Sequence, residues 1–325
     1  MNGKILITAR SFRKTPGRHL DILREAGYEL VESPHDRPLT AAEIAPLLAD
    51  VDAAILGLDE VTAESVAGAS RLRVISRYGV GVDSIDIAAM TARGIVVTVT
   101  PGANSVAVAE LTMGLILALA RHIPYADREV RQGKWGRKTG VELSGATLGL
   151  IGLGRIGRDV ARRAYAFGMA ICYYDPFPPP LEAMAGFTAR ACSLDDLLAG
   201  SDFVSLHLPL SEETRNLIDA AALARMKPSA YLINTARGGL VDEQALYEAL
   251  ASGRLAGAAF DAFAQEPPGD SPLLKLDNFI ASPHAGSATA QTTLRMGLMA
   301  SENALAVLRG ERPDGVVNPA VFSRD

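Results

Sequence analysis

The sequence predicts an α/β protein made of two doubly wound domains, each with a parallel sheet covered by helices on both faces. Short apolar runs, typical of buried strands, alternate with helical patterns along nearly the whole chain, and this alternation favours parallel sheets. At 325 residues the chain is longer than most single domains. Hydrophobic residues make up 48% of it and charged residues 21%, which is ordinary for a protein able to bury a sizeable core.

The first hundred residues alternate strands with helices. The clearest helix signal is Thr40 with Glu43, a capping box that opens a helix over 41–48. Strands are expected at 5–8, 28–31, 53–56, 72–76 and 95–99, and helices at 17–26, 41–48 and 85–91, with a further short helix starting at Thr62.

A long apolar helix is predicted from Asn104 to about His122. It is apolar almost all round, so it must be buried on several sides. A subunit interface would bury it, and so would a position between the domains of a monomer. Its most apolar part, 111–120, is too short to cross a bilayer, which needs about 20 residues. No membrane partner is therefore expected.

A glycine fingerprint after a short strand indicates a dinucleotide site. The run 148–151 is predicted as a buried strand, and Gly152, Gly154 and Gly157 follow it as G-x-G-x-x-G before a helical pattern. These glycines suit a tight turn, a close approach to a pyrophosphate and close helix–strand packing. Asp175 ends the next strand, 23 positions after Gly152, where it would accept hydrogen bonds from the adenosine ribose. A glycine-rich structural turn is the alternative, and the strand–helix–strand context favours the dinucleotide.

The remaining pattern completes the second domain. Helices are expected at 194–198, at 220–225 and from Asp242 to about Ser252. Strands are expected at 203–207, 231–235, 257–260 and 279–282, and they bring the parallel strands of this domain to six. A long amphipathic helix at 289–308 is well placed to return to the first domain. The sequence therefore predicts a Rossmann NAD-binding domain over 101–285, inserted in a flavodoxin-like substrate domain made of 1–100 and 286–325.

Three reactive side chains follow predicted strands of the second domain, at the carboxyl ends where open α/β sheets bind ligands. Arg237 could grip a carboxylate with two hydrogen bonds, or it could form a surface salt bridge. Glu266 could be an ordinary loop carboxylate, and His284 a structural group. Together they suit hydride transfer to a ketone. A histidine supplies the proton, a nearby carboxylate favours the imidazolium, and an arginine orients the substrate and polarises its keto oxygen.

These motifs resemble those of the D-isomer-specific 2-hydroxyacid dehydrogenase family over essentially the full length. The similarity rests on the fingerprint, on Asn234-Thr-Ala-Arg-Gly-Gly, on Asp261 with Glu266-Pro, and on Pro283-His-Ala-Gly. Within the family, the phosphoglycerate dehydrogenases and the glyoxylate/hydroxypyruvate reductases are most similar. The resemblance implies an NAD-dependent enzyme acting on a small 2-keto or 2-hydroxy acid, typically a homodimer through its cofactor domain.

The resemblance also implies roles for individual residues. Arg237, Glu266 and His284 would form the catalytic triad, with His284 the proton donor and both Arg237 and His284 touching the substrate. The cofactor would be lined by Gly152, Gly154, Arg155, Ile156, Gly157, Asp175, His207, Leu208, Thr235, Ala236, Asp261 and Gly286.

The substrate carboxylate would lie on backbone N–H groups of the loop Tyr78, Gly79 and Val80.

One segment departs from the family pattern. Phosphoglycerate dehydrogenases carry a phosphate-contacting arginine just after the strand equivalent to 53–56, where this chain has the acidic Gly57-Leu-Asp-Glu60. Arg77 and Arg137 remain as possible anion partners. The departure argues against phosphoglycerate as the substrate.

Two other functions remain open. The chain could be a dinucleotide-sensing binding protein that resembles the family's transcriptional corepressors, which keep the triad. It could also be a formate dehydrogenase relative, although there glutamine replaces the acid paired with histidine, and Glu266 argues against it.

Charge and cysteine content limit other classes of function. The formal net charge of -5 and the scattered basic residues argue against a nucleic-acid partner. Cys172 and Cys192 have no metal-binding or redox spacing, so no metal site is expected. A reducing, cytoplasmic setting is the default expectation.

Overall fold

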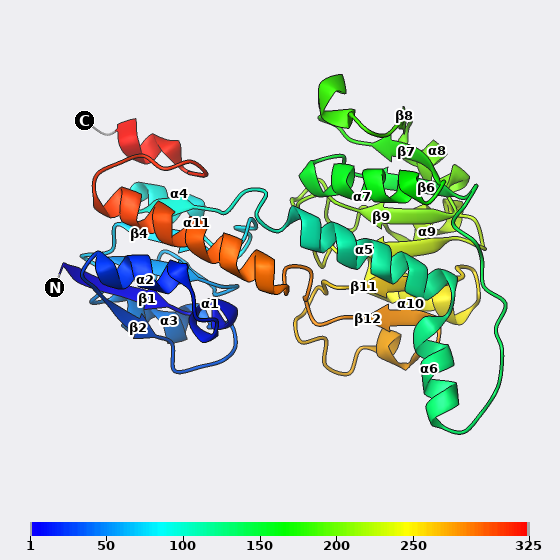
Figure 1. The fold of residues 1–325 in the computed structure, drawn as a ribbon, viewed down its shortest axis with the longest axis horizontal. Coiled ribbons are helices and arrows are strands. Elements are labelled where there is room, and N and C mark those ends of the chain that lie inside the picture. The colour runs from blue at the N-terminus through cyan, green and yellow to red at the C-terminus, as the bar shows by residue number, and fades with distance from the viewer. Residues whose placement is uncertain (1, 324–325) are drawn as a thin grey trace. The chain divides into compact units, whose positions relative to one another are not determined.

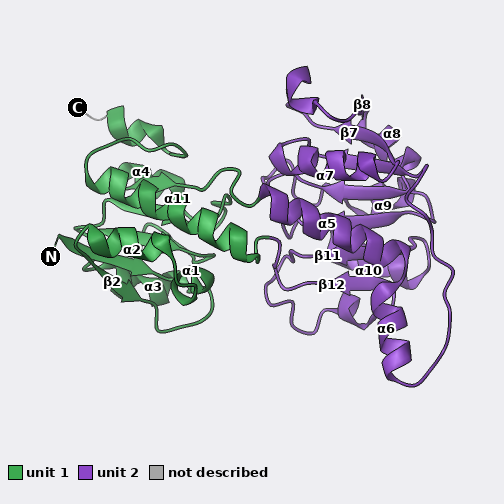
Figure 2. Cartoon of the chain, in the orientation of Figure 1, with its two compact units in different colours: residues 1–104, 287–325 green, residues 105–286 purple. Residues whose placement is uncertain are grey.

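The computed structural model describes residues 2–323, and the chain divides into two compact units (Figures 1 and 2). Unit 1 comprises residues 1–104 and 287–325, and unit 2 comprises residues 105–286. Each unit has its own parallel sheet, with helices on both faces, which confirms the predicted fold class.

Unit 1 contains a five-stranded parallel sheet in the order β2-β1-β3-β4-β5. This is the flavodoxin-type order, as the sequence predicts. The order reverses between β1 and β3. The strands are β1 (Gly3–Ile7), β2 (Tyr28–Glu32), β3 (Ala53–Leu56), β4 (Val74–Arg77) and β5 (Val96–Thr98).

Alternating side chains of the unit 1 strands divide between two cores. On β1, Ile5 and Ile7 pack on the face covered by α2 (Arg18–Glu25) and α11 (Ala290–Leu308). Leu6 packs on the other face, with α3 (Ala41–Leu48) and α4 (Ile87–Ala92). Figure 1 shows α11 lying beside α2. The last long helix of the chain therefore completes the first core, as its amphipathic pattern predicts.

Two local features of unit 1 differ from the sequence prediction. The helix expected from Thr62 is wrong, because this segment forms turns: the Ser65 N–H donates to the Thr62 hydroxyl, and the Ser65 hydroxyl donates to the Thr62 carbonyl. Such side-chain bonds compete with helix formation. Conversely, a short helix, α1 (Arg10–Lys14), follows β1 and buries Phe12. It is too short for hydrophobic periodicity to reveal.

Unit 2 contains a seven-stranded parallel sheet in the order β12-β11-β10-β9-β6-β7-β8. Numbered within the unit, this is the Rossmann order with one strand added. The predicted count of six is one short, because β8 (Arg190–Ala191) has two exposed residues and no apolar run. The other strands are β6 (Thr147–Ile151), β7 (Ala170–Tyr174), β9 (Phe203–Leu206), β10 (Tyr231–Asn234), β11 (Gly257–Phe260) and β12 (Phe279–Ala281).

Helices cover both faces of the unit 2 sheet. One face carries α5 (Ser105–Ala120) and α7 (Arg155–Ala166). The other carries α8 (Leu194–Gly200), α9 (Ala220–Arg225) and α10 (Glu243–Ala251). Most residues of α5 are buried within unit 2 itself. A helix that the sequence analysis did not predict, α6 (Ile123–Arg131), follows α5 and buries none of its residues.

Short 3-10 helices lie at Leu181–Met184, Pro272–Lys275 and Pro319–Ser323. Within residues 2–323 no single helix is long and apolar enough to cross a membrane, and only the bent pair α5 and α6, at 62°, meets that length and composition when taken together.

The strand orders fix where ligands should bind. The order reverses between β1 and β3 in unit 1, and between β6 and β9 in unit 2. Open α/β sheets bind ligands beyond the carboxyl ends of their strands at such points. In unit 2 the glycine fingerprint, 152–157, directly follows β6, so the fingerprint occupies the reversal point.

Candidate active site

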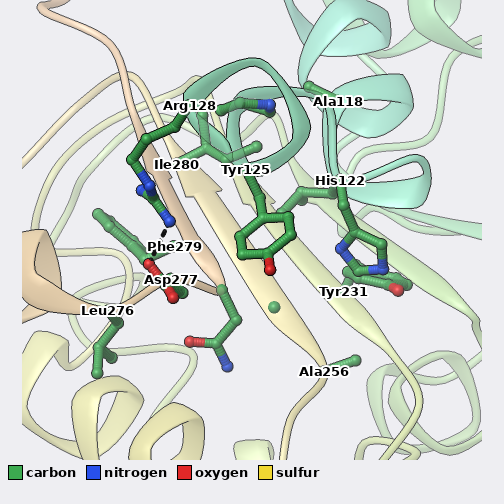
Figure 3. A pocket seen from close by; sticks show the side chains of 14 residues that line it. Ala118, His122, Tyr125, Arg128, Tyr231, Ala256, Leu276, Asp277, Phe279 and Ile280 are labelled. Carbon is green, nitrogen blue, oxygen red and sulfur yellow. Dashed lines mark hydrogen bonds and ion pairs between the residues drawn. The ribbon is translucent and has the colours of Figure 1, made fainter. Parts of the chain in front are cut away.

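A small pocket of about 60 Å³ lies at the amino ends of the unit 2 strands. Its lining includes the first residues of β10, β11 and β12, which are Tyr231, Gly257 and Phe279. Figure 3 shows the side chains of Tyr231 and Phe279 in this lining. Its cation, Arg128, is paired with Asp277 at 2.5 Å. Because the predicted catalytic side chains follow the carboxyl ends of the strands, this pocket is separate from their site.

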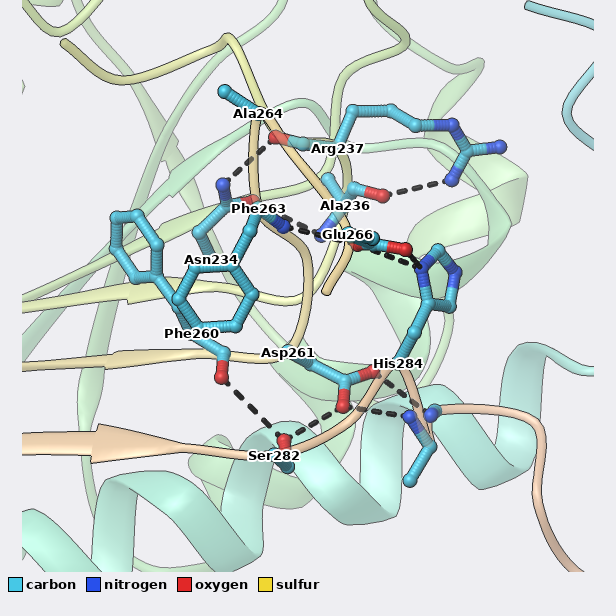
Figure 4. A network of polar contacts seen from close by, with 12 residues as sticks. Asn234, Ala236, Arg237, Phe260, Asp261, Phe263, Ala264, Glu266, Ser282 and His284 are labelled. Carbon is cyan, nitrogen blue, oxygen red and sulfur yellow. Dashed lines mark hydrogen bonds and ion pairs between the residues drawn. The ribbon is translucent and has the colours of Figure 1, made fainter. Parts of the chain in front are cut away.

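His284 and Glu266 form a hydrogen-bonded pair beyond the carboxyl ends of β12 and β11 (Figure 4). Nδ1 of His284 lies 3.0 and 2.9 Å from the two carboxylate oxygens of Glu266. The Nδ1–H therefore donates to Glu266, which leaves Nε2 for another partner. The two side chains are 32% and 30% exposed, so a ligand can reach the pair.

Glu266 is held in its charged form. Burial alone would raise the pKa of Glu266, but the hydrogen bond and charge of His284, the Phe263 N–H and the charge of Arg237 outweigh burial, so its pKa is lowered. The Phe263 N–H donates to Oε1 at 3.0 Å. This carboxylate faces Nδ1 of His284 at 2.9 Å.

Asp261 builds the turn that carries His284. Asp261 follows β11 and is only 2% exposed. Its carboxylate accepts from the Ser282 hydroxyl at 2.6 Å and from the N–H groups of Ala285 and Gly286 at 2.7 and 2.8 Å. His284 has a φ of 50°, in the left-handed region that residues other than glycine rarely adopt. The three bonds stabilise this conformation, and both oxygens of Asp261 take part in the turn. A contact between Asp261 and NAD stays a prediction.

Arg237 lies in a tight loop after β10. The side chain of Asn234, the last residue of β10, accepts from the Ala236 N–H at 3.1 Å and donates to the Arg237 carbonyl at 2.8 Å. The guanidinium donates to the Ala236 carbonyl at 2.7 Å, and Figure 4 shows it on the same side of the network as His284. The loop thus brings Arg237 within electrostatic reach of Glu266. This structural role of Asn234 was not predicted from the sequence, although an asparagine at a strand end commonly forms such a turn.

His207 is the second histidine at this edge of the sheet. Burial lowers the pKa of His207 to about 3, so its ring is neutral near pH 7. Its Nε2 lies 3.0 Å from the Ser205 hydroxyl oxygen. A general acid must carry a proton near the working pH. His207 does not meet this requirement.

The glycine fingerprint forms a cradle that fits a pyrophosphate. Gly152 has a φ of 97°, and a Cβ there would lie 2.8 Å from the His207 carbonyl oxygen. A Cβ on Gly157 would lie 2.3 Å from the Gly152 carbonyl oxygen. Gly154 instead faces open space and is the N-cap of α7, without a side-chain cap. An uncapped helix N-terminus beside open space offers free N–H groups and a positive dipole end to an anion.

Asp175 follows β7 and already accepts two backbone hydrogen bonds. The Leu153 N–H donates to one carboxylate oxygen at 2.7 Å, and the Phe177 N–H donates to the other at 2.8 Å. Each oxygen retains a further lone pair. Asp175 therefore ties the glycine loop to β7 and still has capacity for ribose hydroxyls, a contact that stays a prediction.

The other predicted cofactor residues also follow the carboxyl ends of unit 2 strands. Arg155, the first residue of α7, is exposed, whereas Ile156 packs against the core. Thr235 is nearly buried, and its hydroxyl oxygen lies 2.8 Å from that of Thr112 in α5. The remaining positions in the loops after β9, β10 and β12 are Leu208, Ala236 and Gly286.

In unit 1 the predicted carboxylate-binding loop follows β4. The Tyr78 N–H donates to the Leu56 carbonyl and the Gly79 N–H to the Arg77 carbonyl, both at 2.9 Å. These two N–H groups are therefore engaged within unit 1. The Val80 N–H has no hydrogen-bond partner within residues 2–323, so of the three residues singled out it is Val80 that keeps its N–H for a ligand.

Comparison with known proteins gives consistent matches. The family model described as D-isomer specific 2-hydroxyacid dehydrogenase, NAD binding domain, matches residues 113–286. A D-3-phosphoglycerate dehydrogenase of Methanocaldococcus jannaschii is 46% identical over 283 residues, which are 86% of this chain and 54% of that protein, so the chain spans about half its length. A glyoxylate reductase of Thermofilum pendens is 45% identical over 326 residues, 95% of this chain and 94% of that protein. The crystal structure of the TT0316 protein from Thermus thermophilus superimposes with a TM-score of 0.88 at 42% identity, covering 97% of this chain and 99% of that one.

Proposed function

The chain belongs to the D-isomer specific 2-hydroxyacid dehydrogenase family, and from this premise we propose that it transfers hydride reversibly between NADH and a small 2-keto acid. It is an oxidoreductase whose cofactor is NAD(H), which the family binds in the domain matched by residues 113–286. We assign NAD(H) to unit 2 and recognition of the substrate to unit 1. The observation that carries the proposal is the His284–Glu266 pair, 2.9 Å apart and accessible.

The proton is handled by residues of this chain. NADH, when bound, supplies the hydride that reduces the C2 carbonyl. The oxygen left by that reduction needs a proton, and Nε2 of His284 is the ring nitrogen free to donate it, because Nδ1 faces Glu266. Keto acid, NADH and one proton thus give the 2-hydroxy acid and NAD⁺. In the reverse direction the neutral ring takes the proton back, so His284 alternates between its two forms.

Arg237 orients the substrate in this reaction. A guanidinium presents paired donors in a plane, which matches a carboxylate or a keto oxygen beside it. In this role Arg237 polarises the keto oxygen and stabilises the charge that develops on it. The Asn234 turn supports the role, since it fixes the Arg237 backbone by a hydrogen bond of 2.8 Å.

We propose that the substrate carries a small uncharged group on C2 rather than a phosphorylated one. The loop after β3 contains Asp59, which is 2% exposed and accepts from the N–H groups of Leu39 at 2.9 Å and Gly57 at 3.0 Å, and from the Thr8 hydroxyl. Thr8 and Gly57 follow β1 and β3, where the strand order of unit 1 reverses. A buried carboxylate at a ligand-binding edge disfavours a phosphate by like-charge repulsion.

A panel of 2-keto acids tests both parts of the proposal. Consumption of NADH would be followed with glyoxylate, hydroxypyruvate, 2-ketobutyrate and phosphohydroxypyruvate. We expect turnover with one or more of the first three and a lower kcat/KM for the phosphorylated compound. No turnover with any of them would favour the alternative of a dinucleotide-sensing protein.

The variant Gly57→Arg examines the substrate assignment separately. Position 57 accepts a Cβ with contacts of 3.5 Å and more, so a side chain can begin there without a clash at its first atom. It places a cation where the phosphoglycerate dehydrogenases carry one, and should raise kcat/KM for phosphohydroxypyruvate relative to hydroxypyruvate. A ratio that stays at the wild-type value would contradict the idea that this loop selects the substituent.

We further propose a homodimer that forms through unit 2. The segment after α5 exposes three large apolar side chains within thirteen residues: Ile123 is 52% exposed, Val130 53% and Trp135 78%. Exposed apolar surface of this kind supports an interaction site. Light scattering should give twice the mass of the chain, and Trp135→Ser should weaken association. A monomeric wild type at micromolar concentration would refute the dimer.

We also propose a cytoplasmic location. Both cysteines, Cys172 and Cys192, are free thiols, a state that a reducing compartment maintains. Fractionation of the native cell with an antibody to the protein tests this, and recovery outside the cytoplasm would contradict it.

A further inference from the structure

Arg77 is a buried cation that no step of the proposed reaction uses. It is the last residue of β4 and is only 6% exposed. The sequence leaves it as a possible anion partner, yet its guanidinium faces carbonyl groups of unit 1. Nε donates to the Gly81 carbonyl at 3.0 Å, and Nη1 donates to the Tyr78 carbonyl at 2.6 Å and to the Leu56 carbonyl at 3.5 Å.

Thr100 holds the same loop at a second point. Thr100 is fully buried, and its N–H and hydroxyl both donate to the Gly79 carbonyl, at 2.8 and 3.1 Å. Gly79 has a φ of 145°, and a Cβ there would lie 2.9 Å from Nη1 of Arg77. Glycine at this position therefore leaves room for the guanidinium to contact the loop. The carbonyls of 78, 79 and 81 all face these two side chains.

The direction of these carbonyls determines the direction of the neighbouring N–H groups. In a trans peptide the C=O and the following N–H point opposite ways. Because the Gly79 carbonyl faces Thr100 and the Gly81 carbonyl faces Arg77, the Val80 N–H faces away from Thr100 and the Val82 N–H faces away from Arg77. Neither has a hydrogen-bond partner in the described part of the chain, and Val80 is 37% exposed. Backbone N–H groups that are left unpaired along one loop can bind an anion.

We propose that Arg77 and Thr100 are positioning residues for the substrate carboxylate. By holding the loop carbonyls inward they direct the N–H groups of Val80 and Val82 toward the anion, without touching it. This inference rests on the proposed function, in which the loop receives the carboxylate. Their effect is therefore on the affinity for the carboxylate rather than on hydride or proton transfer.

Arg77→Met tests the proposal through two ligands that differ in charge. Oxamate is an anionic analogue of a 2-keto acid, and oxamide is its neutral counterpart. Calorimetric titration of the NADH complex of the full chain gives the dissociation constant of each. We expect oxamate binding to weaken about ten- to hundredfold, the loss typical of hydrogen bonds to a charged group, and oxamide binding to change much less. The KM for glyoxylate should rise with the oxamate constant, while kcat stays within about twofold.

Arg73→Met is a matched control. Arg73 precedes β4, and its guanidinium also donates to backbone carbonyls, those of Leu308 at 2.8 Å and Val307 at 3.0 Å, but at the opposite end of the strand. This variant should lose stability and keep its affinity for oxamate. If Arg77→Met does not fold, Thr100→Val carries the test, because it removes only the hydroxyl donor to Gly79, and Thr100→Ser should restore binding.

The outcomes separate this inference from the function on which it rests. An unchanged oxamate constant in Arg77→Met, an equal loss for oxamate and oxamide, or an equal loss in Arg73→Met would overturn the positioning role. A wild type that binds no oxamate would also overturn it. The wild type could also reduce no keto acid but bind oxamate, with weaker binding in Arg77→Met. That result would refute the proposed reaction and support the carboxylate-binding loop.

Discussion

Replacing Glu266 by glutamine removes the charge that faces His284 and keeps a hydrogen-bonding group of the same size. The pKa of Glu266 is lowered in part by His284, and an opposite charge in direct contact generally favours the charged form of its partner. Reduction of a keto acid needs the protonated ring, and oxidation of a hydroxy acid needs the neutral one. In Glu266→Gln, reduction should therefore fail at a lower pH than in wild type, and oxidation should become available at a lower pH.

The expected displacement of the two profiles is about one pH unit. An opposite charge in direct contact is worth about 1–3 units. The low end of that range applies, because the side chains of His284 and Glu266 are 32% and 30% exposed and solvent screens the pair. The assay is kcat/KM against pH in both directions for both proteins. Superimposable profiles would refute the coupling of Glu266 to His284.

Glu243→Gln is the matched control for this experiment. Glu243 accepts from the Ala264 N–H at 2.7 Å, in the loop that carries Glu266, and has no hydrogen bond to His284. Its variant should keep the wild-type profile. The free energy of unfolding gives a second measurement. Because the pKa of Glu266 is lowered in the folded state, Glu266 stabilises the fold above its unfolded pKa and loses this contribution as pH falls through its folded pKa. The difference in unfolding free energy between wild type and Glu266→Gln should thus shrink in acid.

Three further predictions follow from the site. Arg237→Ala should lower kcat/KM by about 10²–10³, the usual effect of losing one donor to a developing oxyanion. Arg237→Lys should restore little of this activity, because lysine lacks the planar fork. Steady-state kinetics measures the loss, and the thermal midpoint of unfolding should stay unchanged. Wild type should prefer NADH to NADPH, because Asp175 repels a 2′-phosphate, and Asp175→Ala should narrow the ratio of the two kcat/KM values. The pKa of His207 is about 3 in the folded protein, against an ordinary 6.5. The free energy of unfolding should therefore fall by about 1.4 kcal/mol for each pH unit below about pH 6.5. In urea unfolding, the free energy of His207→Asn should depend less steeply on pH.

Much of the fold is readable from the sequence because its strands are short apolar runs buried on both faces. The strands β3 and β11 have the predicted bounds, since apolar runs and turn residues delimit them. The helix α3 begins at its capping box, which the structure forms in full. In contrast, β8 has only two exposed residues and α6 buries none, so neither produces a hydrophobic pattern that could be recognised.

The sequence indicates the candidate residues of the site but not the contacts that support them. The joint motifs indicate His284, Glu266 and Arg237, and the distance of 2.9 Å between the first two could come only from coordinates. Two contacts were not predictable from the sequence. The Asp261 carboxylate accepts from the N–H groups of the turn that carries His284, and the Arg77 guanidinium donates to backbone carbonyls of unit 1. Asp261 accepts hydrogen bonds from residues more than twenty positions along the chain, and Arg77 donates to carbonyls of the loop that follows it, so both sets of contacts depend on the folded conformation.

The central claim is that His284 supplies the proton in the reduction of a 2-keto acid by NADH. The most direct measurement is the rate of NADH oxidation with hydroxypyruvate for wild type and for His284→Asn, together with the affinity of each for NADH and chiral analysis of the product. We predict that wild type forms D-glycerate and that His284→Asn binds NADH equally well but loses about 10²–10⁴ in kcat. A variant that keeps the wild-type rate, or a wild type that forms L-glycerate, would contradict the account.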